Sequence, residues 1–196
     1  KVLPGIRAAF IDAGLERSTF LPATQVVSEE FLDAASPTPP QEGQQQPAGR
    51  NGRKPRKKRR RGVALIERSI HKGEEILVQV ISVPGWEKGP KVTTYISIPG
   101  HFLVYMPTVK GLGVSKKIQK QKERSRLRRI GETVRKEVEG GFIIRSASEG
   151  APEEQLVQEA RWLHGRWKTA TERARGKRPP YMLLQELSLA ERILRE

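Results

Sequence analysis

An arginine and a serine stand side by side directly after a short apolar run, and together they offer chemistry that suits a phosphate. Residues 142–144 predict a strand within the stretch GGFIIRSASEG, and Arg145 and Ser146 follow it. Arginine presents a planar fork of N–H donors that matches phosphate oxygens, and serine adds a hydroxyl donor. The backbone that follows can add further N–H groups. We interpret the pair as a pocket for a terminal phosphate. The alternative, which this stretch alone favours, is an ordinary strand end with one solvated arginine.

The composition points to a polyanionic partner. The chain has 196 residues, a formal net charge of +15 and a sequence pI of about 10.5. This balance favours nucleic acid and, less strongly, an anionic membrane surface. No apolar run approaches the ~20 residues that a membrane-spanning helix needs, so no membrane span is expected. The absence of cysteine excludes disulfides and thiolate chemistry and fits a reducing compartment.

The positive charge is concentrated in two stretches. Residues 50–61 are dominated by Lys and Arg and lie within residues 34–62, a segment of Pro, Gln, Gly and basic residues with almost nothing apolar. Such a segment cannot bury enough surface to offset its ordering entropy, so we expect disorder. The run is either a solubilising tract or, as we favour, a polycationic arm that grips RNA phosphates without sequence choice. A second cluster extends from Lys116 to Lys136.

The pattern of apolar residues predicts strands first and helices later, and hence an α+β chain. Ile6, Ala8 and Phe10 alternate with other residues, and a turn signal follows at residues 12–14. Further strands are expected at residues 18–21, 76–81, 91–98 and 102–106, with a short helix at 63–72; short strands separated by Gly and Pro turns suggest a small barrel. Amphipathic helices are expected at residues 125–139 and at 181–195, and a long one between them has its first turn at Pro152, its apolar face at residues 156–174 and its end at Gly176.

Five segments occur in an order that resembles the front half of the ribonuclease E/G family, which are bacterial and plastid endoribonucleases. KVLPGIRAAFIDAGLERSTFLPA opens the chain, and GEEILVQVISVPGWEKGPKVTTYISIPGHFLVYMP follows the basic segment. GVSKKI, GGFIIRSASEG and YMLLQELSLAERILRE come after them. The resemblance rests on the combination and covers nearly everything except about residues 34–62. It implies an OB-fold RNA-binding barrel in residues 1–94, incomplete at its N-terminus and interrupted by the basic segment. It further implies part of an RNase-H-like 5′-sensor domain in residues 95–196.

The resemblance gives RNA-binding roles to three residues of the barrel. Phe10 and Phe20 match aromatic residues that stack on bases, and Lys88 matches a lysine that contacts RNA. Single-stranded RNA is commonly held in this way, with bases on exposed rings and cations along the backbone. Without the resemblance, a Phe on a strand is more often a core residue. Ala13 stands where ribonuclease E carries an aromatic residue, which implies a reduced stacking surface.

The resemblance also assigns the phosphate pocket. Arg145 and Ser146 match the family's phosphate-sensing Arg-Thr pair, and the backbone around Gly100 and Val104 matches positions that the family uses beside it. Glycine at such a position permits close approach. Lys116 stands where the family often has arginine, and it keeps the charge without the bidentate geometry. The alternative for Lys116 is a solvated basic helix start.

No catalytic residue and no metal ligand is expected in this chain. Metal-assisted phosphodiester cleavage needs clustered acids, whereas the aspartates are Asp12 and Asp33 alone and the glutamates are scattered. The histidines His71, His101 and His164 lack the spacing of ligands or of a general base. The family's nuclease site lies in a following DNase-I-like domain. We therefore expect a parent enzyme that is a Mg²⁺-dependent endoribonuclease, and a fragment that is inactive alone and needs no cofactor.

The resulting prediction is the RNA-binding and 5′-monophosphate-sensing portion of an endoribonuclease that acts in RNA processing and decay. Its partner would be single-stranded RNA, its location the bacterial cytoplasm or a plastid, and its parent a homo-oligomer. One alternative is a non-catalytic RNA-binding module of a translation or ribosome-associated factor. Another is a targeting protein whose basic run binds membranes or import receptors. The downstream sequence would decide, because an enzyme must continue into an acidic metal site.

Overall fold

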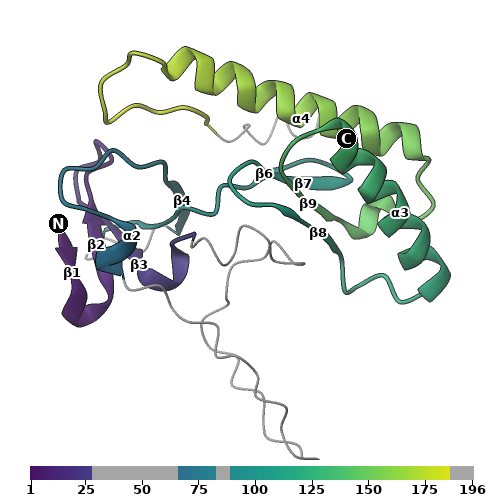
Figure 1. Ribbon diagram of the computed structural model, residues 1–196, viewed down its shortest axis with the longest axis horizontal. Coiled ribbons are helices and arrows are strands. Elements are labelled where there is room, and N and C mark those ends of the chain that lie inside the picture. Colours follow the sequence, from purple (N-terminus) through teal and green to yellow (C-terminus); the bar gives the residue numbers. More distant parts are fainter. Residues whose placement is uncertain (28–65, 83–88, 186–196) are drawn as a thin grey trace, which may run out of the picture.

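The computed structural model describes residues 1–27, 66–82 and 89–185, and within them two β-sheets and two long helices confirm the expected α+β class (Figure 1). Three predictions lie outside the described residues: the disordered basic segment with its run at 50–61, the contact residue Lys88, and most of the expected final helix.

The first sheet has five strands in the order β1-β2-β3-β5-β4. Their bounds are β1 (Val2–Leu3), β2 (Ala8–Ile11), β3 (Thr19–Pro22), β4 (Gln79–Ser82) and β5 (Lys91–Thr93). The pairs β1–β2, β2–β3 and β4–β5 are antiparallel, whereas β3 and β5 are parallel. Two 3-10 helices, η1 (Pro4–Ile6) and η2 (Ala23–Gln25), and the short helix α2 (Ile66–Ser69) accompany it. Its core is formed by Ala9, Leu21, Ala23, Val26, Ile66, Ile70 and Val92.

Three strand predictions in this part had the wrong bounds. Ile6 belongs to η1 and not to the alternating strand, because Pro4 starts the 3-10 turn and Arg7, with a φ of 50°, reverses the chain before β2. The expected strand at residues 91–98 is two strands. It breaks after Thr93, because the hydroxyls of Thr93 and Thr94 donate to the Gln25 carbonyl at 3.1 and 3.2 Å and tie the chain to η2. The strand expected at residues 76–81 is likewise confined to β4.

The second sheet has four strands in the order β6-β7-β9-β8. Their bounds are β6 (Ile98–Pro99), β7 (Leu103–Met106), β8 (Gly111–Val114) and β9 (Gly141–Ile144). The pairs β6–β7 and β7–β9 are antiparallel, whereas β8 runs parallel to β9. The sequence pattern did not reveal β8, since two of its residues are glycine, which is depleted in strands.

Helices α3 (Gln121–Glu137) and α4 (Glu153–Ala174) cover one face of the second sheet (Figure 1). Alternate residues of β7 and β9 point into the core on that side, and each helix contributes one apolar stripe. The buried set comprises Leu103, Tyr105, Phe142, Ile144, Leu127, Ile130, Val134, Leu156, Ala160 and Leu163. The stripes of both helices were predicted. None of the described helices is long and apolar enough to cross a membrane.

The predicted bounds of two helices were wrong. Helix α3 starts at Gln121 and not at residue 125, because its first turns hold a good helix-forming composition and an internal Glu123–Arg126 ion pair. Residues 181–185 are not helical, so the last expected helix does not begin at Tyr181. Instead, Leu184 packs against the core between the second sheet and its helices.

Candidate functional site

Three loops meet at one edge of the second sheet. Leu103 opens β7 and pairs with Ile144, which closes β9, and β8 ends beside the same residue. The loops at residues 100–102, 115–117 and 145–148, which flank these strand ends, therefore lie together. The structure thus brings four of the predicted residues to one edge: Gly100, Lys116, Arg145 and Ser146.

The Arg145 guanidinium is tied to this edge at one of its nitrogens. Its Nη1 donates to the carbonyl of Gly100, and its backbone N–H donates to the carbonyl of Phe102 at 2.8 Å. The side chain is exposed. Because a guanidinium carries five N–H donors, the bond to Gly100 leaves most of the fork to an external anion.

The turn after Arg145 is fixed by a serine that sequence analysis did not single out. Ser148 is fully buried, and its Oγ donates to the Phe102 carbonyl at 2.8 Å. It closes the 3-10 helix η3 (Ser146–Ser148) against the loop before β7. Ser146, which was predicted, opens that helix and is exposed. The turn therefore presents the Ser146 side chain at the surface beside Arg145.

A carboxylate on α4 fixes the loop before β7 by hydrogen bonds to its backbone. Glu159 accepts hydrogen bonds from the backbone N–H groups of His101, Phe102 and Leu103, at 2.5, 2.8 and 2.8 Å. A Cβ on Gly100 would lie 2.6 to 2.8 Å from this carboxyl group. Glycine was expected to permit close approach at this position, and here the approaching group is Glu159. Sequence analysis missed Glu159, whose one signal is an acid beside the apolar stripe of α4.

A second acid fixes the loop that follows η3. Glu123 accepts from Nε and Nη2 of Arg126, at 2.8 and 2.6 Å, and from the backbone N–H of Gly150 at 2.9 Å. Arg126 also donates to the carbonyl of Ala151 at 2.9 Å. The hydrogen bonds from Arg126 and Gly150 stabilise the ionised carboxylate and lower the pKa of Glu123 to about 2. This pair joins the start of α3 to the loop behind Ser146.

The remaining predicted residues of the pocket lie at different depths. Lys116 is exposed in the loop after β8, whose Ser115 N–H donates to Ile144 at 2.8 Å. Val104 lies inside β7, paired with Pro99 and Ile143, and its side chain packs against a small third cluster. That cluster is formed by Tyr95, Met106 and Val109. Lys116 is therefore exposed at the edge, whereas the side chain of Val104 is packed beneath the strand.

The first sheet brings the two predicted aromatic residues together. Phe10 and Phe20 are direct partners across β2 and β3, and their rings lie edge to face with centroids 5.8 Å apart. Phe10 is 36% exposed and Phe20 is half-buried, while their neighbours Ala9 and Leu21 are fully buried. Lys88 lies outside the described residues, but the chain soon after it packs on β3, since the Phe20 N–H donates to the Pro90 carbonyl at 2.8 Å.

The described residues contain no cluster of side chains suited to holding a metal ion. Within residues 1–27, 66–82 and 89–185 no group of three or more His, Cys, Asp or Glu side chains could hold a metal ion. His164 has a structural contact: its Nδ1 lies 3.0 Å from the Tyr105 hydroxyl, which donates to the Glu139 carbonyl. Burial, reinforced by the charge of Glu139, raises the pKa of Tyr105 to about 12, so this phenol stays neutral. The arrangement suits recognition of anions and of aromatic bases.

Comparison with known proteins gives one consistent family. A model described as the Ribonuclease E/G family matches residues 97–196. Ribonuclease G of Escherichia coli K12 is 35% identical over 196 residues, and ribonuclease G of Haemophilus influenzae is 37% identical over 197. Both alignments cover all of this chain and 36% of the relative. Ribonuclease E of a Nostoc species is 29% identical over 196 residues, which are 24% of its length. The chain spans little more than a third of the ribonuclease G relatives.

Replacement of Glu159 should loosen the edge. In Glu159→Gln the side-chain amide has one oxygen for the three backbone N–H groups of residues 101–103. Its NH₂ group replaces the other oxygen and cannot accept a hydrogen bond from them. A hydrogen bond to a charged group contributes ~1.5–3 kcal/mol, so we expect the free energy of unfolding to fall by about that amount in urea titrations. Amide exchange at residues 101–103 should accelerate. Glu154→Gln, on the exposed first turn of α4, is the matched control. Equal stability of the two variants would contradict the role of Glu159.

The Glu123 carboxylate should make the fold sensitive to acid. Its pKa is about 2 in the folded chain and ~4.3 in an unfolded one, so its stabilising contribution is complete above the unfolded value. That contribution is lost as the pH falls from about 4.5 toward 2. Glu123→Gln should therefore remove part of the acid dependence of the unfolding midpoint. The control is Glu132→Gln, whose ion pair with Arg135 is largely exposed. An NMR titration that gives Glu123 an ordinary pKa would refute the prediction.

Proposed function

Because this chain belongs to the ribonuclease E/G family, we propose that it is the RNA-binding and 5′-end-sensing portion of a single-strand-specific endoribonuclease of RNA processing and decay. The observation that carries the proposal is the meeting of Arg145, Ser146 and Gly100 at one exposed edge of the second sheet. The described relatives are ribonucleases, and none of them favours a translation-associated module.

The edge is suited to a 5′-monophosphate. A terminal monophosphate carries more charge and more accessible oxygens than an internal diester, and Arg145 offers it a planar fork while Ser146 offers a hydroxyl. Lys116 adds a positive charge from the neighbouring strand end. Since Gly100 fixes the guanidinium and Ser148 fixes the turn, these donors are positioned before the ligand arrives. A 5′-hydroxyl would leave them unpaired.

The first sheet is suited to hold the strand itself. A base can stack on the exposed ring of Phe10, with Phe20 behind it, while Lys88 contacts the backbone. We assign residues 1–94 to an OB-type domain and residues 95–196 to an RNase-H-like 5′-sensor. Five strands in a non-sequential order support the first assignment. A parallel β8–α3–β9 unit beside antiparallel strands supports the second, and the connection between β5 and β6 contains the proposed boundary.

Hydrolysis is assigned to a part of the parent enzyme that lies outside this chain. The described residues do not fit a magnesium site, since no three of their His, Asp or Glu side chains gather where they could hold a metal ion, and Glu159 and Glu123 are already engaged by backbone amides and by Arg126. We propose that the parent supplies Mg²⁺ elsewhere, acts as a homo-oligomer in the bacterial cytoplasm or in a plastid, and uses this portion to select its substrate.

Arg145→Ala should erase the preference for a 5′-monophosphate. Loss of the charged hydrogen bonds is worth ~1.5–3 kcal/mol, and we expect the affinities for 5′-monophosphate and 5′-hydroxyl forms of one oligonucleotide to become equal. Competitive binding to the chain measures this. Arg173→Ala, exposed at the end of α4, removes the same charge and should keep the preference. If Arg145→Ala keeps it too, Arg145 is an ordinary surface residue and the sensing function is wrong.

Phe10→Ala should weaken binding of a 5′-hydroxyl single-stranded oligonucleotide by ~1–3 kcal/mol, because a stacked base loses its ring. Phe10→Trp keeps an aromatic face and should retain most of the affinity. Thermal unfolding of both variants is recorded alongside. An alanine variant that unfolds more readily but binds RNA as tightly as the parent would assign Phe10 to packing.

A further inference from the structure

Helix α3 carries more exposed positive charge than its packing uses. Its apolar stripe is buried in the second core, and each of its glutamates is already paired. Glu123 is bonded to Arg126, Glu132 lies 3.2 Å from Arg135, and Glu137 lies 2.6 Å from Arg161 of α4. No carboxylate of the helix is left to neutralise its other cations.

Those other cations form an exposed surface. Within the described part of the chain they have no ion-pair partner: Lys122, Arg128, Arg129 and Lys136 on the helix, and Lys116, Lys117 and Lys120 in the loop before it. Lys122, Arg129 and Lys136 recur every seven residues, so they lie on nearly one side of α3. At a rise of 1.5 Å per residue, consecutive members are about 10 Å apart along the axis.

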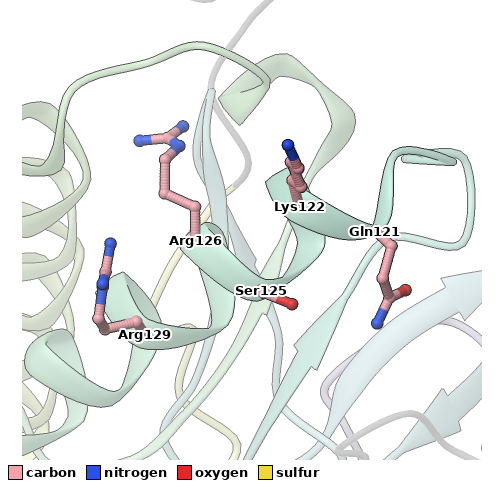
Figure 2. Close-up of a pocket in the computed structure, with 5 residues that line it drawn as sticks. All are labelled: Gln121, Lys122, Ser125, Arg126 and Arg129. Carbon is pink, nitrogen blue, oxygen red and sulfur yellow. The ribbon is translucent and has the colours of Figure 1, made fainter.

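The first turns of this surface contain a shallow depression. It has a volume of about 360 Å³ and is lined by Gln121, Lys122, Ser125, Arg126 and Arg129. Figure 2 shows Lys122, Arg126 and Arg129 extending toward the same side of the helix. Every lining side chain can donate a hydrogen bond and none is a carboxylate. Arg126 is held in place by Glu123 and the Ala151 carbonyl, which leaves Lys122 and Arg129 to engage an anion.

We propose that this face of α3 binds the phosphodiester backbone of RNA, as a site separate from the pocket at Arg145. The inference rests on the proposed function for the identity of the polyanion. A strand laid along α3 can bring phosphates to Lys122, Arg129 and Lys136 in turn, without any reading of bases. The face binds RNA rather than a lipid surface, because interfacial helices present apolar side chains to the membrane and those of α3 are buried in the core.

The cationic surface of α3 lies next to the edge of the second sheet that carries Arg145. Arg124 donates from Nη1 to the carbonyls of Ser115 and Ile118, at 2.7 and 3.1 Å, and so fixes the start of α3 against the loop that carries Lys116. On the other side, Glu123 holds the Gly150 N–H in the loop after Ser146. The first turns of α3 thus contact both loops beside Arg145, and an RNA held there by its 5′ end meets the cations of α3 next.

The test compares two double variants of the full chain with the same loss of charge. Lys122→Gln/Arg129→Gln removes the proposed contacts, and Lys168→Gln/Arg173→Gln removes two exposed cations of α4. Affinity for a single-stranded oligonucleotide is measured against salt concentration. Each phosphate contact on a single strand contributes about 0.7 to the slope of log K against log salt, so the α3 variant should lose about 1.4 from the slope. The α4 variant should keep it.

A second comparison separates this proposal from the one on which it rests. The α3 variant should keep the ratio of affinities for 5′-monophosphate and 5′-hydroxyl RNA, whereas Arg145→Ala should lose that ratio. A reduced slope in the α3 variant, with no effect of Arg145→Ala on the ratio, would refute 5′-sensing and support the α3 site. Equal slopes in the two double variants would overturn the α3 site. So would loss of binding to phosphatidylserine vesicles in the α3 variant with an unchanged RNA slope.

Discussion

The seating of the Glu159 carboxylate on three consecutive backbone N–H groups is the interaction on which the phosphate edge depends. An ionised acid at a half-buried position is costly unless its oxygens are bonded, and the amides of His101, Phe102 and Leu103 meet that need. With the N–H groups directed toward α4, the loop presents carbonyls toward the end of β9. Gly100 then accepts from the Arg145 guanidinium, and Phe102 accepts from both the Arg145 N–H and Ser148. Removal of Glu159 would therefore displace the carbonyls that position Arg145, although Glu159 does not contact Arg145 itself.

The glutamates of α3, like Glu159, are engaged by neighbouring groups, and this affects the charge that the helix presents. A chain that binds a polyanion must keep its own carboxylates from repelling it. The Glu159 carboxylate accepts hydrogen bonds from backbone N–H groups, and the glutamates of α3 form ion pairs with arginines. Lys116, Lys122 and Arg129 remain exposed and unneutralised within the described residues. The positive surface of α3 thus depends on the pairing of its glutamates with neighbouring arginines, and not on the number of basic residues alone.

Local patterns were sufficient for the parts of this fold that are governed by local rules. The apolar stripes of α3 and α4 follow from helical spacing, and Phe10 faces Phe20 because the turn at Gly14, with a φ of 71°, folds β2 back onto β3. The errors occur where distant residues decide. Glu159 and its loop are 58 residues apart at His101, and β5 stops where Thr94 meets Gln25. No period in the sequence encodes such a contact. The strand end at Ile144 could therefore be predicted from a local pattern, whereas the Glu159 carboxylate that fixes the neighbouring loop could not.

The two surfaces proposed to bind RNA share one structural connection. Tyr95, Met106 and Val109 form a small core on the side of the second sheet away from the helices, and Val27, which follows the first sheet, packs there with Val104 and Ile143. The Val27 N–H donates to Oγ1 of Thr94 at 2.7 Å, which fixes Val27 beside the segment that joins β5 to β6. The Val104 side chain therefore joins the second sheet to the chain that leaves the first. Under the proposed function, an RNA bound at both Phe10 and Arg145 would make its second contact as an intramolecular event, at an effective concentration that depends on the span between the sites. On that proposal, rigidity at this junction would contribute to affinity by fixing the span between the two sites.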